Sequence, residues 1–137
     1  MVDVNYWAVL VSAAVSMFIG SIWYGPLFGK KFMVAVGMDK WTPEQKEAEM
    51  KKMGMTYFLQ FVASILTFYV LVVLMHRTGS LSVNGGLMIA FWVWLGFVMP
   101  TQLGSAIWGG KMTLFWIGAG NMLVTLLASG AILGAWL

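Results

Sequence analysis

The stretch "GSIWYGPLFGKK", residues 20–31, ends the first long apolar run of the chain. Its glycine–proline pair favours the end of a helix, and two lysines follow within a few residues. A shorter version, "GSAIWGGK" at residues 104–111, closes a later apolar run. Because tryptophan, tyrosine and lysine are typical of the edges of a bilayer, both stretches predict the point at which a membrane-spanning helix leaves the lipid.

The composition agrees with a membrane environment. Of the 137 residues, 61% are hydrophobic and 9% are charged, whereas ordinary soluble domains carry about 25% charged residues. Four apolar runs, at about residues 4–27, 53–75, 85–107 and 112–137, are long enough to cross the hydrocarbon as helices. Since backbone polar groups in lipid must be bonded inside the protein, we predict an all-α integral membrane four-helix bundle. It forms a single transmembrane domain over residues 1–137.

The positions of the charges predict the orientation of the spans. The connector at residues 28–52 holds six of the eight basic residues, and Lys111 lies on the same side of a four-span chain, opposite Arg77. An excess of lysine and arginine marks the cytoplasmic side, so we expect a cytoplasmic connector and both termini outside. Trp23 and Tyr24 are then expected at the headgroup level. The first run lacks the preceding basic residues of a cleaved signal peptide, which predicts a retained span.

Within the connector, "WTPEQKEAEMKK" at residues 41–52 carries the signals of a helix start. Thr42 suits the N-cap, Pro43 the first helical position, and Gln45 the return side of a capping box. The pattern predicts a short amphipathic cytoplasmic helix between the first two spans. The sequence leaves open whether this helix lies along the membrane surface or continues into the second span.

Two helical hairpins, at about residues 1–76 and 77–137, contain similar phrases. In each, a lysine-terminated exit is followed by a span that opens with "MTYF" (55–58) or "MTLF" (112–115). A parallel internal repeat would explain the similarity, because the first and third spans run in the same direction. Two similarly built exits from the membrane would explain it as well, and both interpretations stay open.

Small residues predict where the helices approach closely, because helices in lipid associate through backbone proximity and polar contacts. Eight of them lie at or near helical spacing in three spans: Ala8, Ser12, Ser16, Gly20, Gly96, Gly104, Gly130 and Gly134. The last two form a G-x-x-x-G pattern, which fits either a contact inside the bundle or a homodimer. Pro100 predicts a bend in the third span, because proline removes one helical hydrogen bond.

The residues that usually carry catalysis or metal binding are scarce. The chain has no cysteine, and its single histidine, His76, falls at the end of the second span. No span carries a charged residue in its centre. This pattern argues against an enzyme, a metal site, a cofactor and proton-coupled transport. It also argues against nucleic-acid binding, because membrane orientation explains the lysines.

Three amides are the strongest polar groups within the spans: Gln60, Gln102 and Asn121. An amide is costly in hydrocarbon unless it is paired, so we expect all three to face the interior of the bundle. They either bond to one another in the core or line a shared ligand-binding pocket. The aromatic residues considered for that pocket are Trp23, Tyr24, Trp92 and Trp108.

Several residues together resemble a known family. Asn5, Trp7 and Ala8 are followed by "IGSIWYGPLFGKKF", a charged connector and three further spans. This arrangement resembles the bacterial membrane protein family known as domain of unknown function 1761, and residues 23–29 are its most specific part. The resemblance covers nearly the whole chain. It implies a small four-span protein of the inner membrane and implies no activity.

The sequence therefore predicts a non-enzymatic binding or interaction module in a bacterial inner membrane, in contact with the lipid bilayer. The alternative is a small carrier of a neutral or apolar solute that works as a homodimer, since four spans enclose little space. A lipid-binding accessory protein is a third interpretation. A carrier or a binding protein predicts a cavity lined by the three amides, whereas a scaffold predicts a dry core.

Overall fold

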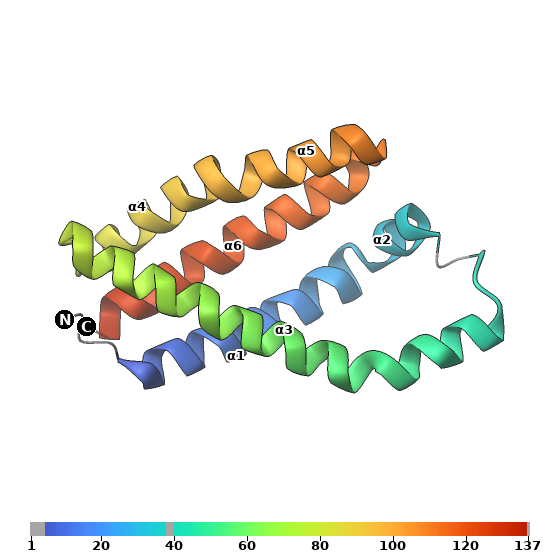
Figure 1. The fold of residues 1–137 in the computed structure, drawn as a ribbon, viewed down its shortest axis with the longest axis horizontal. Coiled ribbons are helices and arrows are strands. Elements are labelled where there is room, and N and C mark those ends of the chain that lie inside the picture. Colours follow the sequence, from blue (N-terminus) through green and yellow to red (C-terminus); the bar gives the residue numbers. More distant parts are fainter. Residues whose placement is uncertain (1–4, 38–39, 137) are drawn as a thin grey trace.

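The computed structural model describes residues 5–37 and 40–136, and all regular structure among them is helical. Four segments are long and apolar enough to cross a membrane: Tyr6–Leu27, Pro43–Thr78, Val83–Gly109 and Met112–Trp136. The expected all-α class and the expected number of candidate spans are therefore confirmed. Successive spans run in opposite directions, so the starts of α1 (Tyr6–Ile22) and α4 (Val83–Val93) lie at the same end of the bundle (Figure 1).

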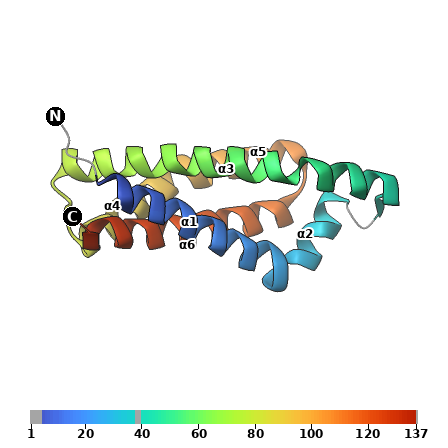
Figure 2. The ribbon, with the colours of Figure 1, turned by 90° about the horizontal axis from the view of Figure 1, so that it is seen from below.

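The last span, α6 (Met112–Trp136), is the centre of the bundle. It packs against α1, α4 and α5 (Met99–Gly109), and it is the most buried of the four spans. α3 (Pro43–Thr78) packs mainly against α1 and reaches α4 near its own C-terminus. Figure 2 shows that α3 and α1 lie close together at one end of the bundle and separate toward α2 (Gly29–Val36) at the other.

Glycines bring α4 and α6 into backbone contact. Gly130 of α6 faces Gly86 of α4, and Gly134 faces the backbone of Ser82, the N-cap of α4. A Cβ atom at Gly130 would also lie 3.1 Å from the Cβ of Ala90. The G-x-x-x-G face is therefore occupied inside the chain and is not available for a homodimer contact. Gly86, its main partner, was not among the predicted packing residues.

The other predicted packing residues divide into two groups. Ala8 and Ser12 are fully buried in the core. By contrast, a Cβ atom at Gly20, Gly96 or Gly104 would meet nothing within 4 Å. The packing expectation does not hold for the glycines of the third span, because that helix contacts α6 through Gly86 and Ala90 instead.

The first and third spans are each interrupted by one π-helical turn. These turns are η1 (Trp23–Leu27), which contains Pro26, and η3 (Trp94–Val98), which ends two residues before Pro100. Proline lacks the N–H group that an α-helix needs, and a π turn is a common way to absorb such an interruption. The irregularity expected at Pro100 therefore takes the form of a wider turn on its N-terminal side.

The connector differs from the expected arrangement. Thr42 and Gln45 form the capping box, with N···O distances of 2.9 and 3.2 Å. The helix that they start is α3 itself, which runs for 36 residues and includes the second span. The sequence left this continuation open. The separate short helix of the connector is α2, which ends at Gly37 in the left-handed conformation (φ 82°) and which was not predicted.

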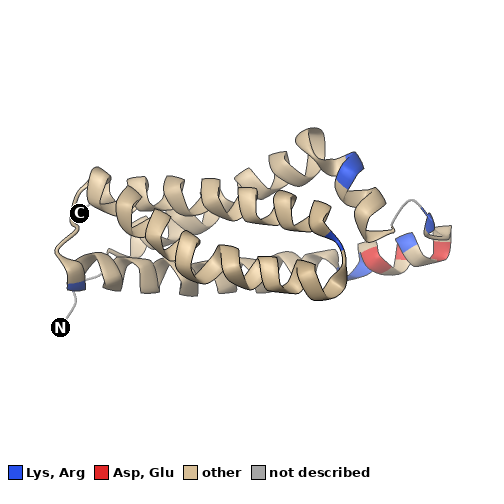
Figure 3. Cartoon of the chain, turned by 90° about the horizontal axis from the view of Figure 1, so that it is seen from above, with Lys and Arg blue, Asp and Glu red and all other residues tan. Residues whose placement is uncertain are grey.

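The charged residues gather at one end of the bundle, as Figure 3 shows. We call this the lysine-rich end; it comprises α2, the start of α3 and Lys111. Arg77 lies in the last turn of α3, at the opposite end. The ion pair between Lys51 and Glu47, at 3.9 Å, is exposed, so it contributes little to stability.

Candidate ligand-binding cavity

A cavity of about 560 Å³ lies between α1, α3 and α6, on the lysine-rich side of the apolar core. This volume is within the range of about 300–1,000 Å³ that is typical of small-molecule sites. Among the described residues, no charged side chain lines it. Ten lining side chains carry a hydroxyl or an amide: Ser16, Ser21, Tyr24, Tyr57, Gln60, Ser64, Thr67, Gln102, Asn121 and Thr125.

Helical spacing explains how these groups meet. Ser16, Gly20 and Tyr24 are four residues apart and therefore share one face of the first span, which turns toward α6. On α6, Asn121 and Thr125 are also four apart and face the same space. Nearer the opposite end of the bundle, Ala8 and Ser12 of α1 are fully buried. The cavity lies further along the helix, at Ser16, Gly20 and Tyr24, and Figure 2 shows that α1 and α3 separate in that direction.

All three predicted amides line the cavity, and they come from three different helices. Gln60 donates from Nε2 to Ser64 Oγ at 3.5 Å, at the limit of a hydrogen bond, and Ser64 Oγ donates to the Gln60 carbonyl at 2.9 Å. Among the described residues, no hydrogen bond joins one of these amides to another. The structure thus places them around one space and does not show the mutual bonding that was the first alternative.

Three oxygen atoms at the cavity are buried and lack a hydrogen-bond partner: Gln102 Oε1, Asn121 Oδ1 and Thr125 Oγ1. The amide of Gln102 lies against Gly118 of α6, where an added Cβ would come within 3.5 Å of Oε1. A buried polar atom without a partner costs about 1–3 kcal/mol. Three such atoms beside one cavity favour a polar occupant that supplies hydrogen-bond donors.

Tyr24 is held in place by the unpredicted helix α2. Its ring packs edge-on against Phe32 with the ring centroids 4.8 Å apart. Its side chain also approaches Asn121, which places the phenol at the cavity wall. Tyr24 therefore lines the cavity, where the pocket hypothesis placed it. Its level relative to the headgroups stays a prediction.

Trp23 packs against α6 and is not among the residues that line the cavity. Its indole Nε1 donates to the Ile117 carbonyl of α6 at 2.9 Å. Gly120 makes this contact possible, because a Cβ atom there would lie 3.0 Å from the indole ring. Trp23 is therefore not among the residues that line the cavity, since its ring packs on the backbone of α6. Its level relative to the headgroups stays a prediction.

Trp94 makes an equivalent contact with the backbone of α6, and this contact was not predicted. Its Nε1 donates to the Ala119 carbonyl at 2.8 Å, two residues from the carbonyl that Trp23 contacts. Each tryptophan opens a π turn, and each begins a Trp-x-Gly triplet. This triplet occurs in two spans that run in the same direction, and it is the sequence signal that could have predicted the two equivalent contacts. Trp92 and Trp108, which were considered for the pocket, are instead 59% and 94% exposed.

We expect Trp94→Phe to lower the free energy of unfolding by about 1 kcal/mol, the typical net value of one hydrogen bond. Phenylalanine keeps most of the packing against α6 and removes the donor. Thermal unfolding in detergent micelles measures the change. Trp92→Phe, two residues away on an exposed side chain, is the matched control and should leave the midpoint unchanged. Equal midpoints for the two variants would contradict a stabilising role of the indole bond.

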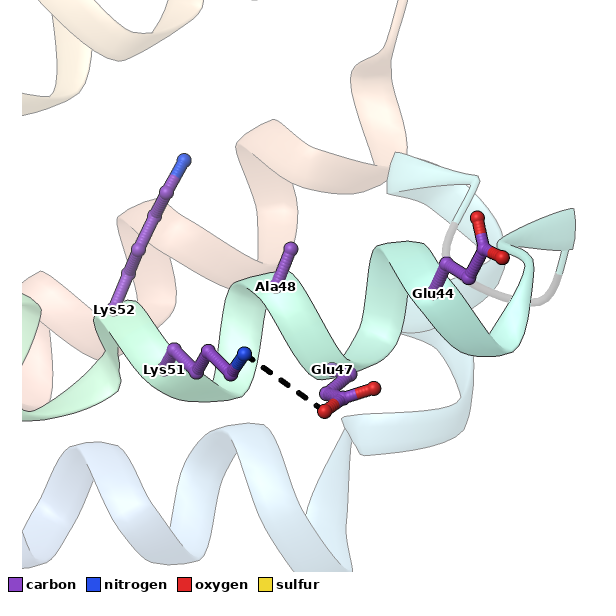
Figure 4. Close-up of a pocket in the computed structure, with 5 residues that line it drawn as sticks. All are labelled: Glu44, Glu47, Ala48, Lys51 and Lys52. Carbon is purple, nitrogen blue, oxygen red and sulfur yellow. Dashed lines mark ion pairs between the residues drawn. The ribbon is translucent and has the colours of Figure 1, made fainter.

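A second hollow lies on the surface at the start of α3. Figure 4 shows that its lining side chains, among them Glu44, Glu47 and Lys52, project from consecutive turns of one helix. The residues around it are exposed. A hollow formed by one helix alone has no opposing wall, so it does not make a binding site.

Comparison with known proteins identifies a family. No curated protein and no solved structure matches the chain significantly. A family model described as "Protein of unknown function (DUF1761)" matches residues 7–134, which include all three amides and both tryptophans of the π turns. The resemblance seen in the sequence is thereby confirmed, and the chain belongs to the DUF1761 family.

Proposed function

We propose that this protein binds a small, uncharged molecule with several hydrogen-bonding groups in the cavity between α1, α3 and α6. The observation that carries the proposal is the set of unpartnered oxygens of Gln102, Asn121 and Thr125 at one cavity. Carboxamides both donate and accept hydrogen bonds. Such a lining matches hydroxyl, amide or carbonyl groups of a ligand.

The charge of the lining supports an uncharged ligand. An ion in a cavity at membrane depth needs an opposite charge to offset its lost hydration. The polar side chains among the described lining residues carry hydroxyls and amides, and none of them is charged. The proposed ligand is therefore neither an ion nor a charged metabolite.

Binding is favoured over catalysis by the same lining. A serine or threonine hydroxyl becomes a nucleophile when an adjacent general base removes its proton. The hydroxyl of Ser64 instead donates to a backbone carbonyl of its own helix, and Ser16 does the same toward Ala13 at 2.6 Å. These hydroxyls act as packing and hydrogen-bonding groups in the proposal.

The proposed setting is a bacterial inner membrane, with the lysine-rich end in the cytoplasm and both termini outside. The separation of charges along the bundle supports this orientation (Figure 3). The cavity then lies in the cytoplasmic half of the membrane.

A carrier is the second candidate, and the closed end of the bundle favours it. Beyond the cavity, fully buried apolar side chains fill the space between the helices, among them Ala8, Met75 and Leu133. A cavity that is closed on one side resembles one state of a carrier that exposes its site alternately. The homodimer that was expected for such a carrier stays a prediction.

Glycerol and 1-monooleoylglycerol test the proposal as probes, because they share one uncharged head group and differ in the acyl chain. We expect at least one to bind the purified protein in nanodiscs. Asn121→Leu and Gln102→Leu should each weaken that binding about tenfold, which corresponds to one or two lost hydrogen bonds. Saturation-transfer NMR and native mass spectrometry measure the binding.

The chain supplies a matched control. Asn84→Leu makes the same replacement as Asn121→Leu at an exposed position outside the cavity lining, and binding should be unchanged. If neither probe binds, or if Asn84→Leu weakens binding as much as Asn121→Leu and Gln102→Leu do, the proposal is wrong.

A further inference from the structure

We infer that the ligand is an uncharged amphiphile that enters from the bilayer, with its polar head among the cavity amides and its apolar chain between α1 and α3. This inference rests on the proposed function and specifies the ligand class and its route. Three observations carry it: the depth of the cavity, the surroundings of its rim, and the chemistry of its lining.

The depth follows from the helical rise of 1.5 Å per residue. On α3, Tyr57 lies five residues beyond Lys52 and is therefore about 8 Å deeper than the last lysine. On α6, Asn121 lies nine residues after Met112, or about 14 Å from the start of the helix. The lining thus begins below the level of the lysines and extends into the hydrocarbon region.

The rim of the cavity is open at this same depth. Tyr57 and Gln60 of α3 are exposed, and so is Ser21 of α1. The neighbouring side chain of Phe58 is 61% exposed and completes an apolar surface around this part of α3. At hydrocarbon depth, the exposed surface meets acyl chains and not water, so a molecule dissolved in the bilayer reaches the rim directly.

The lining distinguishes an uncharged head group from a phosphate. A phosphate group is usually held by arginine, lysine or several backbone N–H groups, whereas none of the described residues that line this cavity is charged. Met17 and Met122 provide an adaptable apolar part of the lining, and the buried ring of Phe68 provides a fixed one. A lining that holds both amides and apolar side chains matches a molecule with one polar and one apolar end.

The experiment uses the full chain in nanodiscs with a photoreactive 1-monoacylglycerol that carries a diazirine in its acyl chain. We expect cross-links at the rim, on the segments of α1 and α3 around Ser21 and Tyr57. An excess of 1-monooleoylglycerol should abolish this labelling, whereas an equal excess of glycerol should leave it unchanged. Asn121→Leu should reduce the labelling about tenfold, and Asn84→Leu should not change it.

A photoreactive phosphatidylglycerol with the same chain is the charged comparison, and it should label the rim no more than it labels the lipid-exposed face around Trp116. If glycerol binds with the expected dependence on Asn121 and the amphiphile does not, the inference is wrong and the proposed function stands. If neither probe binds, both are wrong. Labelling by phosphatidylglycerol that competes with 1-monooleoylglycerol would overturn the uncharged class alone.

Discussion

Alanine at Gly130 is expected to lower the free energy of unfolding by about 1–3 kcal/mol, the usual cost of added volume in a packed core. The new Cβ atom would lie 2.8 Å from the carbonyl carbon of Gly86 and closer still to its oxygen. Both are backbone atoms, so no change of rotamer relieves the contact. α4 must then move away from α6, and the largest helix contact of the bundle is weakened. Thermal unfolding followed by circular dichroism in one detergent measures the loss.

Gly104→Ala is the matched control for this prediction. It makes the same substitution in the third span, where an added Cβ would meet nothing within 4 Å. Alanine also favours a helix over glycine by up to about 1 kcal/mol, so this variant should be as stable as the parent or slightly more stable. A loss at Gly104 as large as that at Gly130 would contradict the backbone contact between Gly86 and Gly130.

The second large effect is expected for Phe68→Ala. Phe68 is 1% exposed and belongs both to the apolar core and to the cavity wall. Truncation removes a buried ring and joins the cavity to a new void in the core. Because lipid tails are as apolar as the ring, the cost arises from lost packing contacts more than from transfer. We expect a loss of about 2–3 kcal/mol, measured by the same unfolding assay.

Phe58→Ala provides the comparison on the same helix. Its ring is 61% exposed, on the part of α3 that extends beyond the helix contacts. The truncation should change the unfolding midpoint little, because lipid replaces the ring without leaving a void. Similar losses of stability for both variants would contradict the larger contribution to the free energy of unfolding that is expected from the buried position of Phe68.

The spans and the site amides were predictable because both follow from the cost of polar groups in lipid. Charges end the apolar runs, and amides within the runs are expected to face the bundle. Gln60, Gln102 and Asn121 lie on three helices that surround one space. That expectation was enough to bring the three together, although Gln60 is exposed at the rim. The capping box at Thr42 was equally local, because it depends on residues three positions apart.

Helix partners were less predictable, because small residues permit a close approach without selecting a neighbour. Gly104 and Gly130 look alike in the sequence, yet only Gly130 meets another backbone. The difference depends on how each helix is rotated about its own axis, and that rotation is set by the whole bundle. Gly86, in a less regular pattern, proved to be the partner of Gly130.

The contacts of two tryptophans could not be predicted for a related reason. An aromatic residue near the end of a span usually anchors at the interface, and this rule says nothing about a partner inside the bundle. The indoles of Trp23 and Trp94 bond to carbonyls of α6. Those carbonyls are accessible because glycines and small residues leave the α6 backbone uncovered, as at Gly120. This is a property of the partner helix and not of the tryptophans.

The π turn η3 contains one residue more than an α-helical turn would need, and Gln102 lies four residues beyond it. If the helix lost that surplus residue by sliding, every later side chain would rotate by about 100° about the helix axis. The carboxamide of Gln102 would swing out of the cavity. Trp94, the first residue of the turn, donates from its indole Nε1 to the Ala119 carbonyl of α6. The polarity of the cavity therefore depends on the residue count of the π turn as well as on the side chains that line the cavity.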